Sequence, residues 1–550
     1  MTHVIDDPNK DDDPNPLTTD QEIMASFGYK QEMNKAMSTI SNFAIAFGCC
    51  SILSGLTPMW GDMMLMAGSV GVIWGWILVS IFTFGVGLSL AEICSAISVS
   101  GGPYIWVARL APAEWAPLAA WITGYCNWLG LTVAITSTDL GLAQFMSSVI
   151  SIRNPDTSFT SVYWQYGLFL AIALLHGLIN SVSVKYNGFF NQASLCWHLV
   201  GLLLIIVVSL ALTPNKASAS WVLTFFQNHT GFSSNSYAFL IALLQSQYTL
   251  SGYDSAAQMS EETRDANKNA PRGILYAIGT AAVCGLVFML AVNFCVQDYD
   301  RQIVKGTLNP QMTQVFLDGV GYGWTFVFMV IIMGAMFFSG SALTLGSSRM
   351  VFAFARDGAT PFSNYLSRVH PQTKTPIFAV WANITFATII GLLYMVNTTA
   401  FNAIVSVNTI ASSFAYFIPI ALRLTVSRQS FKRGPFHLGP FSNLINAISC
   451  VWILFTSILF VCPTQWPVTA LNMNYSSVIF VFVIGTSVLY YELRAKHWFT
   501  GPGQNISLLP DPCDASTPLL TDHRLDLEQT SNTPISRLLS KDILLLHEDT

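Results

Sequence analysis

Two short polar stretches interrupt long apolar segments. The first runs Ser51-Ile52-Leu53-Ser54-Gly55-Leu56-Thr57-Pro58, and the second runs Thr249-Leu250-Ser251-Gly252-Tyr253-Asp254-Ser255. Glycine lets the backbone bend and lets a ligand approach closely. A helix interrupted at such a point leaves N–H and C=O groups without intrahelical partners, and its half-helix ends carry opposite partial charges. These groups suit a zwitterion, whose carboxylate would meet N–H groups and whose ammonium would meet carbonyl oxygens. The predicted binding residues are Ser51, Ile52, Leu53, Ser54, Gly55, Ser251, Gly252, Tyr253 and Asp254.

Each glycine has an alternative explanation, because small residues are also common where membrane helices pack together. Asp254 likewise has two interpretations. Its carboxylate could meet a substrate amine or change protonation during transport, or it could cap a restarting helix. Residues 255–258, with Ser first and Gln fourth, fit a capping box for that helix. The two stretches fall in the first and sixth apolar segments, which are corresponding positions of two five-segment halves. This correspondence favours a binding site over helix packing alone.

Other ionisable residues lie inside apolar segments, where they are candidates for a function. Asp139 could attract cationic substrates or pair with a neighbour near the outer rim. His198 could take part in ion coupling or be a hydrogen-bonded core residue, since histidine titrates near neutral pH. His176 is interpreted mainly as a core residue. Glu261, Glu262, Arg264 and Arg272 form a charged group that is either a gate or an ordinary loop.

Composition identifies the elements that must position these residues. The chain has 550 residues, of which 52% are hydrophobic and 10% charged, whereas soluble domains carry about a quarter charged residues. The mean hydropathy is +0.50. Many apolar segments are near the ~20 residues that cross a bilayer as a helix. The sequence therefore predicts an all-α membrane protein with about twelve transmembrane helices. These are expected near residues 38–61, 68–93, 117–146, 162–181, 191–212, 237–259, 273–296, 323–347, 376–396, 402–424, 443–462 and 475–493.

The distribution of charge sets the expected topology. With the N-terminus in the cytoplasm, only Arg153, Lys216, Arg301 and Lys305 of the 25 Lys and Arg fall outside. This bias follows the positive-inside rule and predicts an even number of spans with both termini cytoplasmic. Asn228, in the sequon Asn228-His229-Thr230, then lies on the outer face as a candidate glycosylation site.

Several classes of function are disfavoured. There is no basic patch to suggest nucleic acid as a partner, and the ten cysteines show neither disulfide nor zinc spacing, so no metal is expected. No nucleophile elbow or phosphate loop indicates an enzyme, and no cofactor is predicted. The acidic, polar start of the chain does not resemble a cleavable signal peptide.

Three stretches give the chain a family resemblance. They are residues 100–106 (SGGPYIW), residues 251–263 with 270–273 (APRG), and residues 348–358 followed by Pro361, residues 369–371 and residues 375–376. In these residues the chain resembles the amino acid–polyamine–organocation superfamily, and more narrowly its amino acid/choline branch of GABA permeases and bidirectional amino acid transporters. The resemblance covers about residues 30–495.

The resemblance implies a five-plus-five inverted repeat with broken helices 1 and 6, plus two additional helices. It implies one repeat at about 37–212, the second at about 237–424, and helices 11 and 12 at about 443–493, within a transporter domain at 37–495. Residues 1–36 and 496–550 are expected to be disordered cytoplasmic tails. Family members often carry an aromatic lid four residues before the glycine of span 6, which is Tyr248 here. Some carry a lysine in span 5, where the nearest polar residue here is His198.

The functional expectation is a secondary transporter of amino acids, with GABA among the candidates, working by alternating access with proton coupling or exchange. A choline or polyamine transporter and a non-transporting amino acid sensor are the alternatives. The expected partners are a small amino acid or amine, protons and membrane lipid. The expected location is the plasma membrane or a vacuolar or lysosomal type of endomembrane. Asp514 with Pro518-Leu519-Leu520 loosely resembles an acidic dileucine sorting signal.

Overall fold

The computed structural model describes residues 24–502, except residues 26, 30–31, 154–158, 160, 307, 309, 397–399 and 470–471. The described part contains no β-strand, and its one isolated bridge joins Met37 to Thr263. Most of the predicted N-terminal tail, nearly all of the predicted C-terminal tail and the dileucine-like stretch lie outside the described residues.

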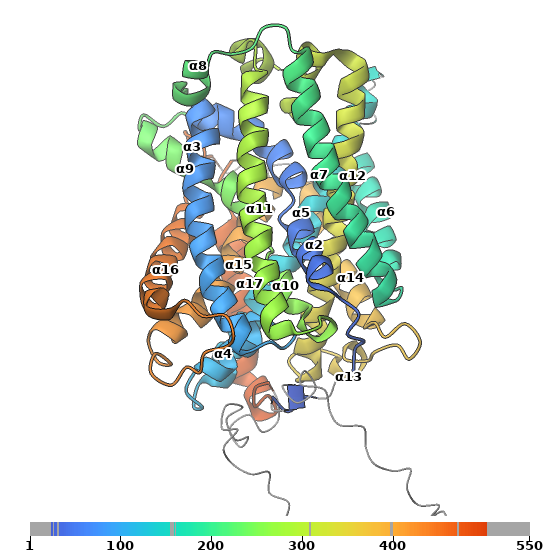
Figure 1. Ribbon diagram of the computed structural model, residues 1–550, viewed down its shortest axis with the longest axis vertical. Helices are drawn as coiled ribbons and strands as arrows, with labels where there is room; N and C mark the ends of the chain where they lie inside the picture. Colours follow the sequence, from blue (N-terminus) through green and yellow to red (C-terminus); the bar gives the residue numbers. More distant parts are fainter. Residues whose placement is uncertain are drawn as a thin grey trace, which may run out of the picture. The chain divides into compact units, whose positions relative to one another are not determined.

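The long helices form a bundle (Figure 1). They are α2 (Thr39–Cys49), α3 (Ile52–Ala96), α5 (Ala116–Arg153), α6 (Val162–Asn180), α7 (Val184–Leu212), α9 (Asn235–Thr249), α11 (Ala266–Phe294), α12 (Met312–Arg356), α14 (Ile377–Val396), α15 (Ala400–Leu424), α16 (Ser442–Leu459) and α17 (Ser476–Leu493). Short helices connect them: α4 (Pro103–Leu110), α8 (Ala219–Thr224), α10 (Ser255–Gln258) and α13 (Ser363–Leu366). Single turns lie at Ser260–Glu262, Asp300–Val304, Gly439–Phe441 and Ala495–His497.

The prediction of an all-α membrane protein is confirmed. Within the described residues, ten helical runs are long and apolar enough to cross a membrane. One run, Thr39–Ala96, joins α2 to α3, and non-helical backbone at Ala67 and Gly68 divides α3 between two predicted spans. The 15-residue α9 is too short to count as such a run. The total of twelve spans and the inverted repeat stay predictions.

Serine side chains begin several of these helices. Ser38, Ser161, Ser218 and Ser234 precede α2, α6, α8 and α9, and each hydroxyl accepts a hydrogen bond from a backbone N–H in the first turn. A serine N-cap satisfies one of the N–H groups that a helix start leaves without a partner. The sequence therefore specifies where these helices begin without adding charge.

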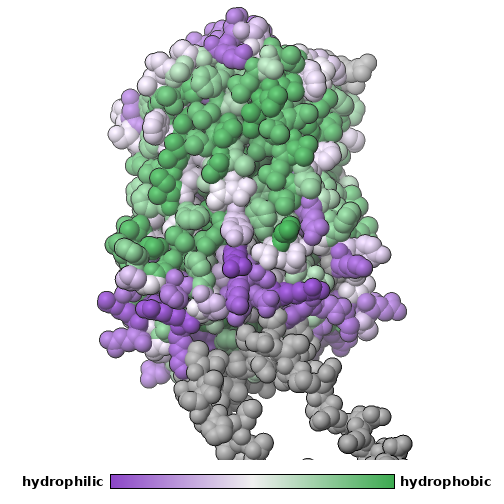
Figure 2. Space-filling view, viewed as in Figure 1, coloured by the Kyte–Doolittle hydropathy of each residue, from purple (hydrophilic) through white to green (hydrophobic). Residues whose placement is uncertain are grey.

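The exterior of the bundle is suited to lipid. Figure 2 shows a broad hydrophobic surface with hydrophilic residues towards both ends of the bundle. Leu203 on α7 and Val283 on α11 are 62% and 65% exposed, although both side chains are apolar. A large exposed apolar surface on a helical bundle is stable in hydrocarbon, where these helices satisfy their own backbone hydrogen bonds.

Close contact between α3 and α11 anchors the helices that carry the candidate site. The two helices pack along much of their length and lie side by side in Figure 1. The Trp76 indole N–H donates to the carbonyl oxygen of Ala282 (2.8 Å), and that of Trp60 donates to Asn293 (2.9 Å). The absence of a side chain at Gly285 makes room for the Trp76 ring, since a Cβ there would overlap the ring.

Gly285→Ala should therefore lower the melting temperature of the purified protein in detergent. Overpacking of this kind costs about 1–3 kcal/mol, because the Trp76 ring must move or α3 and α11 must separate. Gly279→Ala on the same helix is the control, because a Cβ there meets its nearest atom at an ordinary 3.7 Å. Equal melting temperatures for the two variants would contradict the packing argument.

Candidate functional site

The first helix interruption lies at Cys50 and Ser51. α2 ends at Cys49 and α3 begins at Ile52, with Ser51 in a non-helical conformation (φ −57°, ψ 117°). The Ser51 hydroxyl accepts from the Ser54 backbone N–H (3.3 Å) and so caps α3. The break therefore lies at the very start of the predicted stretch of residues 51–58, and the rest of that stretch is helical. Gly55 lies inside α3 and serves close packing there, since a Cβ at this position would lie 2.6 Å from the Thr249 hydroxyl oxygen.

The second interruption lies where the sequence places it. α9 ends at Thr249, and helix resumes at Ser255 as α10. Gly252 has φ +82°, a conformation that side chains of L-residues rarely adopt. The predicted capping box does not form, because Ser255 is already helical and the Gln258 amide donates to Asn127 and Asp254 instead.

The two interruptions lie against each other. The Cys50 thiol donates to the carbonyl oxygen of Ser251 (3.2 Å), and a Cβ on Gly252 would lie 3.1 Å from that of Cys49. The starts of α3 and α10 present N–H groups near the carbonyl ends of α2 and α9, as every helix end does. Both kinds of partial charge therefore meet in one small region.

A polar cavity of about 20 Å³ opens between the interruptions. This is room for about one water molecule, so the site is closed in this conformation. Its walls come from α2, α3, α5, α9 with the following break, α12 and α15. The lining residues are Cys49, Ser51, Ser54, Gly55, Ala134, Thr138, Tyr248, Thr249, Ser251, Ser339, Leu343 and Asn408.

Five of the predicted substrate residues line this cavity: Ser51, Ser54, Gly55, Tyr248 and Ser251. The Tyr248 hydroxyl shares a hydrogen bond with the Ser137 hydroxyl (2.8 Å), so the ring is held across the space between α9 and α5. The other five, Ile52, Leu53, Gly252, Tyr253 and Asp254, are not among the lining residues, and all five are buried.

Asp254 holds the second break together. Its carboxylate accepts hydrogen bonds from the Tyr416 hydroxyl (2.5 Å), the Asn127 amide (3.0 Å) and the Gln258 amide (3.3 Å). Its side chain caps no helix N–H. Three neutral donors from α5, α10 and α15 thus satisfy a fully buried carboxylate, and this network ties the unwound segment to two neighbouring helices.

His198 contacts the first break directly. Its Nδ1–H donates to the Ser194 carbonyl oxygen (2.8 Å), which leaves Nε2 to accept a hydrogen bond from the Ser51 hydroxyl (2.7 Å). A neutral imidazole accepts from the Ser51 hydroxyl in this arrangement, whereas a protonated ring would donate Nε2–H to the same oxygen. The same hydroxyl caps α3, so the state of His198 is linked to the geometry of the break.

Asp139 is buried inside the protein. Its carboxylate pairs with His176 of α6 at 3.1 Å, and neither side chain is exposed. Of the two interpretations of Asp139, pairing with a neighbour is the one that this contact supports. The sequence alone gave no sign of this pair, because its members are 37 residues apart on different helices.

Sequence analysis missed several contributors. Thr138, Ser339, Leu343 and Asn408 line the cavity, and Tyr416 contacts Asp254. Asn408 and Tyr416 belong to one predicted span, where a buried amide or hydroxyl needs a hydrogen-bond partner. Polar residues on one face of that span were the available signal, but their targets could not be known without the fold.

Buried ion pairs close the end of the bundle near α4 and α13, called the α4–α13 end. Arg349 contacts Glu262 at 2.8 Å with both side chains fully buried, and Arg356 makes two hydrogen bonds to Glu261 (3.0 and 3.2 Å). The charged group expected at Glu261, Glu262, Arg264 and Arg272 is thus present in part, with different arginines as the partners. Arg264 instead donates to the carbonyl oxygen of Lys35.

A segment before α2 covers this end. The hydroxyls of Tyr29 and Tyr104 both donate to the Asp357 carboxylate (3.0 to 3.1 Å). Burial first, and then the negative charge of Asp357, raise the pKa of both tyrosines well above its usual value, so both remain donors. The Arg356 guanidinium also lies 4.0 Å above the Tyr29 ring. These contacts therefore join the segment before α2, helix α12 and the residues after α10 at the α4–α13 end.

Asn228 lies between α8 and α9. Its side-chain oxygen accepts from the backbone N–H and the hydroxyl of Thr230, and its amide donates to the Phe232 carbonyl oxygen. Both sequon residues are thus engaged in a local turn. Glycosylation at this position stays a prediction.

Together, the fold and the site define a multi-pass helical membrane protein with a polar cavity between two interrupted helices. The family profile described as amino acid permease matches residues 37–484. The chain therefore belongs to the amino acid permease family, within the superfamily indicated by its motifs, and is a transporter and not an enzyme.

Similar proteins span nearly the whole chain. The chain is 36% identical to an amino-acid permease, BAT1, of Arabidopsis thaliana, over 89% of this chain and 97% of that protein. It is 35% identical to a rice homologue of BAT1 over 88% of this chain and 95% of the homologue. It is 27% identical to a GABA-specific permease of Saccharomyces cerevisiae over 89% of this chain and 86% of that protein.

Gly252→Ala should abolish most uptake by the protein. A left-handed conformation costs a non-glycine residue roughly 1–2 kcal/mol, and the new Cβ would also press on Cys49, so the second break must change shape. Gly188→Ala on α7 is the matched control, because no atom lies within 4 Å of its Cβ position. Uptake in liposomes, normalised to reconstituted protein, provides the measurement. Normal uptake by Gly252→Ala would remove this break from the mechanism.

Glu262→Gln should destabilise the closed protein by about 3–5 kcal/mol, because it leaves the Arg349 charge buried without its partner. The double variant Glu262→Gln/Arg349→Gln should recover part of the loss, since no lone charge remains. The exposed pair of Glu492 and Lys496 is the control, where Glu492→Gln should cost about 0–1 kcal/mol. The measurement is the melting temperature of each variant in detergent. An equal loss of stability in Glu262→Gln and Glu492→Gln would contradict the prediction that the buried pair contributes more.

Proposed function

We propose that this protein carries amino acids across a membrane by alternating access, with the substrate bound between the breaks at Cys50-Ser51 and Leu250–Asp254. The observation that carries the proposal is the meeting of two interrupted helices around one closed polar cavity. The substrate carboxylate would take the N–H groups at the starts of α3 and α10. The ammonium would take the carbonyl ends of α2 and α9.

The closed cavity is consistent with one step of such a cycle. On one side, Gly55 packs on Thr249 and Tyr248 bonds to Ser137. On the other side, the ion pairs of the α4–α13 end hold α12 against the second break. A space that admits about one water must widen before a substrate enters, and it would widen by releasing one closure at a time.

The substrate class we favour is neutral or ω-amino acids, including GABA. Tyr248 is the single aromatic residue among the described cavity-lining residues, whereas a quaternary ammonium is usually held by a cage of several aromatic rings. This argues against choline, the first alternative. The yeast relative named as GABA-specific and the plant relatives named as amino-acid permeases support the proposal.

Coupling to protons, or exchange of one substrate for another, completes the proposal. His198 and Asp139 are the titratable side chains that motivate it. Protonation of His198 at Nε2 would turn the Ser51 hydroxyl oxygen from donor to acceptor, and the hydroxyl hydrogen would then need another partner at the start of α3. The protonation of His198 would in this way change the hydrogen bonds of the first break.

We also propose that the α4–α13 end and both termini face the cytoplasm. Short basic loops support this orientation, since it places most Lys and Arg inside. Asn228 would then face outward as a glycosylation site. The plasma membrane and a vacuolar or lysosomal type of membrane both fit such a transporter.

Counterflow in liposomes tests the proposal. Labelled alanine and labelled GABA are each challenged with neutral, acidic, basic, ω-amino and quaternary compounds at two pH values. Tyr248→Phe removes one buried hydrogen bond of about 1 kcal/mol, and should therefore weaken apparent affinity about fivefold. Tyr125→Phe is the control, because it removes a comparable bond to the Ala359 carbonyl oxygen outside the cavity.

Movement of no amino acid, GABA, choline or polyamine under any ion gradient would refute transport. Binding of an amino acid to the purified protein without counterflow would instead favour the sensor alternative. If choline is the strongest competitor, the substrate is a quaternary amine and not an amino acid. The proposed alternating-access mechanism would be unaffected by that result.

A further inference from the structure

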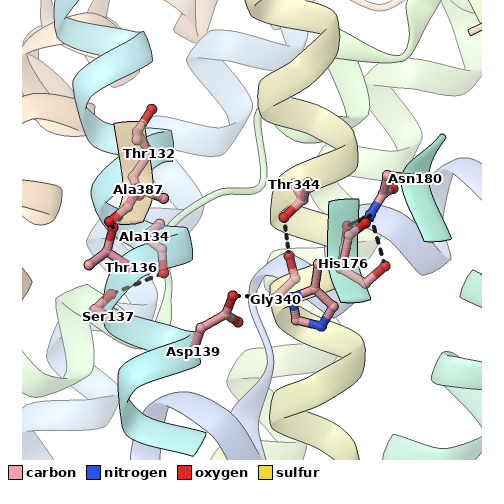
Figure 3. Close-up of polar contacts among 11 residues, drawn as sticks. Thr132, Ala134, Thr136, Ser137, Asp139, His176, Asn180, Gly340, Thr344 and Ala387 are labelled. Carbon is pink, nitrogen blue, oxygen red and sulfur yellow. Dashed lines mark hydrogen bonds and ion pairs between the residues drawn. The ribbon is translucent and has the colours of Figure 1, made fainter. Parts of the chain in front are cut away.

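A carboxylate and an imidazole meet in the interior of the bundle, apart from the cavity. Asp139 of α5 and His176 of α6 lie 3.1 Å apart (Oδ2 to Nδ1), and neither side chain is exposed. Figure 3 shows both side chains directed at the stretch of α12 around Gly340. The His176 ring packs against Phe337, with 4.7 Å between the ring centroids.

The pair is not fully satisfied. Asp139 Oδ1 and His176 Nε2 are buried and have no hydrogen-bond partner in the described structure. Gly340 leaves the space that both groups occupy, since a Cβ there would overlap Asp139 Oδ1 and lie 2.6 Å from His176 Cε1. An apolar core position would not need this arrangement, and leaving two buried polar atoms without partners is unfavourable.

The net charge of the pair depends on one proton. With His176 neutral, an ionised Asp139 leaves a net charge of −1 in the membrane interior, whereas one added proton makes the pair neutral overall. The described contacts of the pair on α5, α6 and α12 include no Lys or Arg. The Tyr248 hydroxyl of α9 reaches α5 through Ser137, the second residue before Asp139. Lone charges in a bilayer are costly, and one added proton removes the net charge of the pair.

The pair lies directly behind the wall of the cavity. Thr138 and Ser339 line the cavity, and each is the chain neighbour of a residue at the pair, Asp139 and Gly340 respectively. Ser137, which precedes Thr138 on α5, shares a hydrogen bond with the Tyr248 hydroxyl. Movement of α5 or α12 would widen the cavity for a substrate, and the same movement would separate Gly340 from the pair and admit water.

We infer that the Asp139–His176 pair binds the proton that moves with the substrate. The pair takes up one proton from the aqueous phase on the outer side, keeps it while the bundle is closed and dry, and gives it to the cytoplasmic phase when the opposite side opens. One proton enters and one leaves in each cycle, so the pair returns to its starting form. This inference rests on the proposed transport function and assigns its coupling to a named site.

Proton movement per substrate is the measurement. Protein is reconstituted in liposomes that contain a pH-sensitive dye, and labelled alanine and labelled GABA are added separately without a pH gradient. The wild type should acidify the lumen as the substrate enters. Asp139→Asn and His176→Gln should keep counterflow and lose this acidification, along with accumulation driven by a pH gradient. A purely structural role would lower both signals together and leave their ratio unchanged.

Asp318→Asn is the control, because this carboxylate also accepts side-chain hydrogen bonds, from Gln302 and Gln314, but lies far along α12 from Gly340. It should retain the wild-type ratio. Where a single variant misfolds, the double variant Asp139→Asn/His176→Gln replaces it, since two amides can pair without a charge. If a variant binds the amino acid but does not exchange it, proton uptake on binding is measured in weakly buffered detergent solution. Such a variant should take up no proton when the amino acid binds.

The outcomes separate the two proposals. Absence of counterflow by the wild type refutes the transport function itself. Counterflow by the wild type without proton movement refutes the inference and leaves transport in place. A wild-type proton ratio in either single variant also overturns it, as does failure of all three variants to fold, which would assign the pair a structural role.

Discussion

The structure depends on one constraint, which is that backbone N–H and C=O groups in a bilayer must find partners inside the protein. Continuous helices meet it by themselves, and the two interruptions at Ser51 and Gly252 do not. Around the first break, the Ser51 hydroxyl caps α3 and also donates a hydrogen bond to His198 Nε2. Around the second, Asp254 collects three donors from neighbouring helices. Polar side chains from neighbouring helices thus support both breaks in the bundle interior.

The sequence predicted the second break accurately and the first only approximately. Gly252 adopts a backbone conformation that glycine accommodates, so its position in the chain locates the break. At Ser51 the backbone is non-helical with a negative φ (−57°), which any residue can adopt, and the nearby Gly55 does not mark the break because it serves packing against Thr249. Glycine therefore locates a break only where the backbone has a positive φ.

Charged residues in the spans were recognised from the sequence, but their roles depend on partners distant in the chain. Asp254 had two interpretations, a substrate ligand or a helix cap; its side chain caps no helix, and Asn127 and Tyr416 donate to its carboxylate in this conformation. The partner of Asp139, His176, stands on another helix and could not be identified from the sequence. Span positions follow from hydropathy and the side of the membrane from charge, whereas the pairing of side chains follows only from helix packing.

The two sides of the cavity are closed by different interactions. The two sides should therefore open under different conditions. The closure at Gly55, Thr249 and Tyr248 consists of close packing and one neutral hydrogen bond. The closure at the α4–α13 end consists of ion pairs such as Arg349 with Glu262. An ion pair in a dry interior attracts strongly, and the same pair in water attracts weakly. The α4–α13 end should therefore open only as water reaches its charges, while the opposite side can open through small shifts of helices. A site behind the cavity wall, such as Asp139 with His176, would meet water by a different route in each case, as directional release of a proton requires.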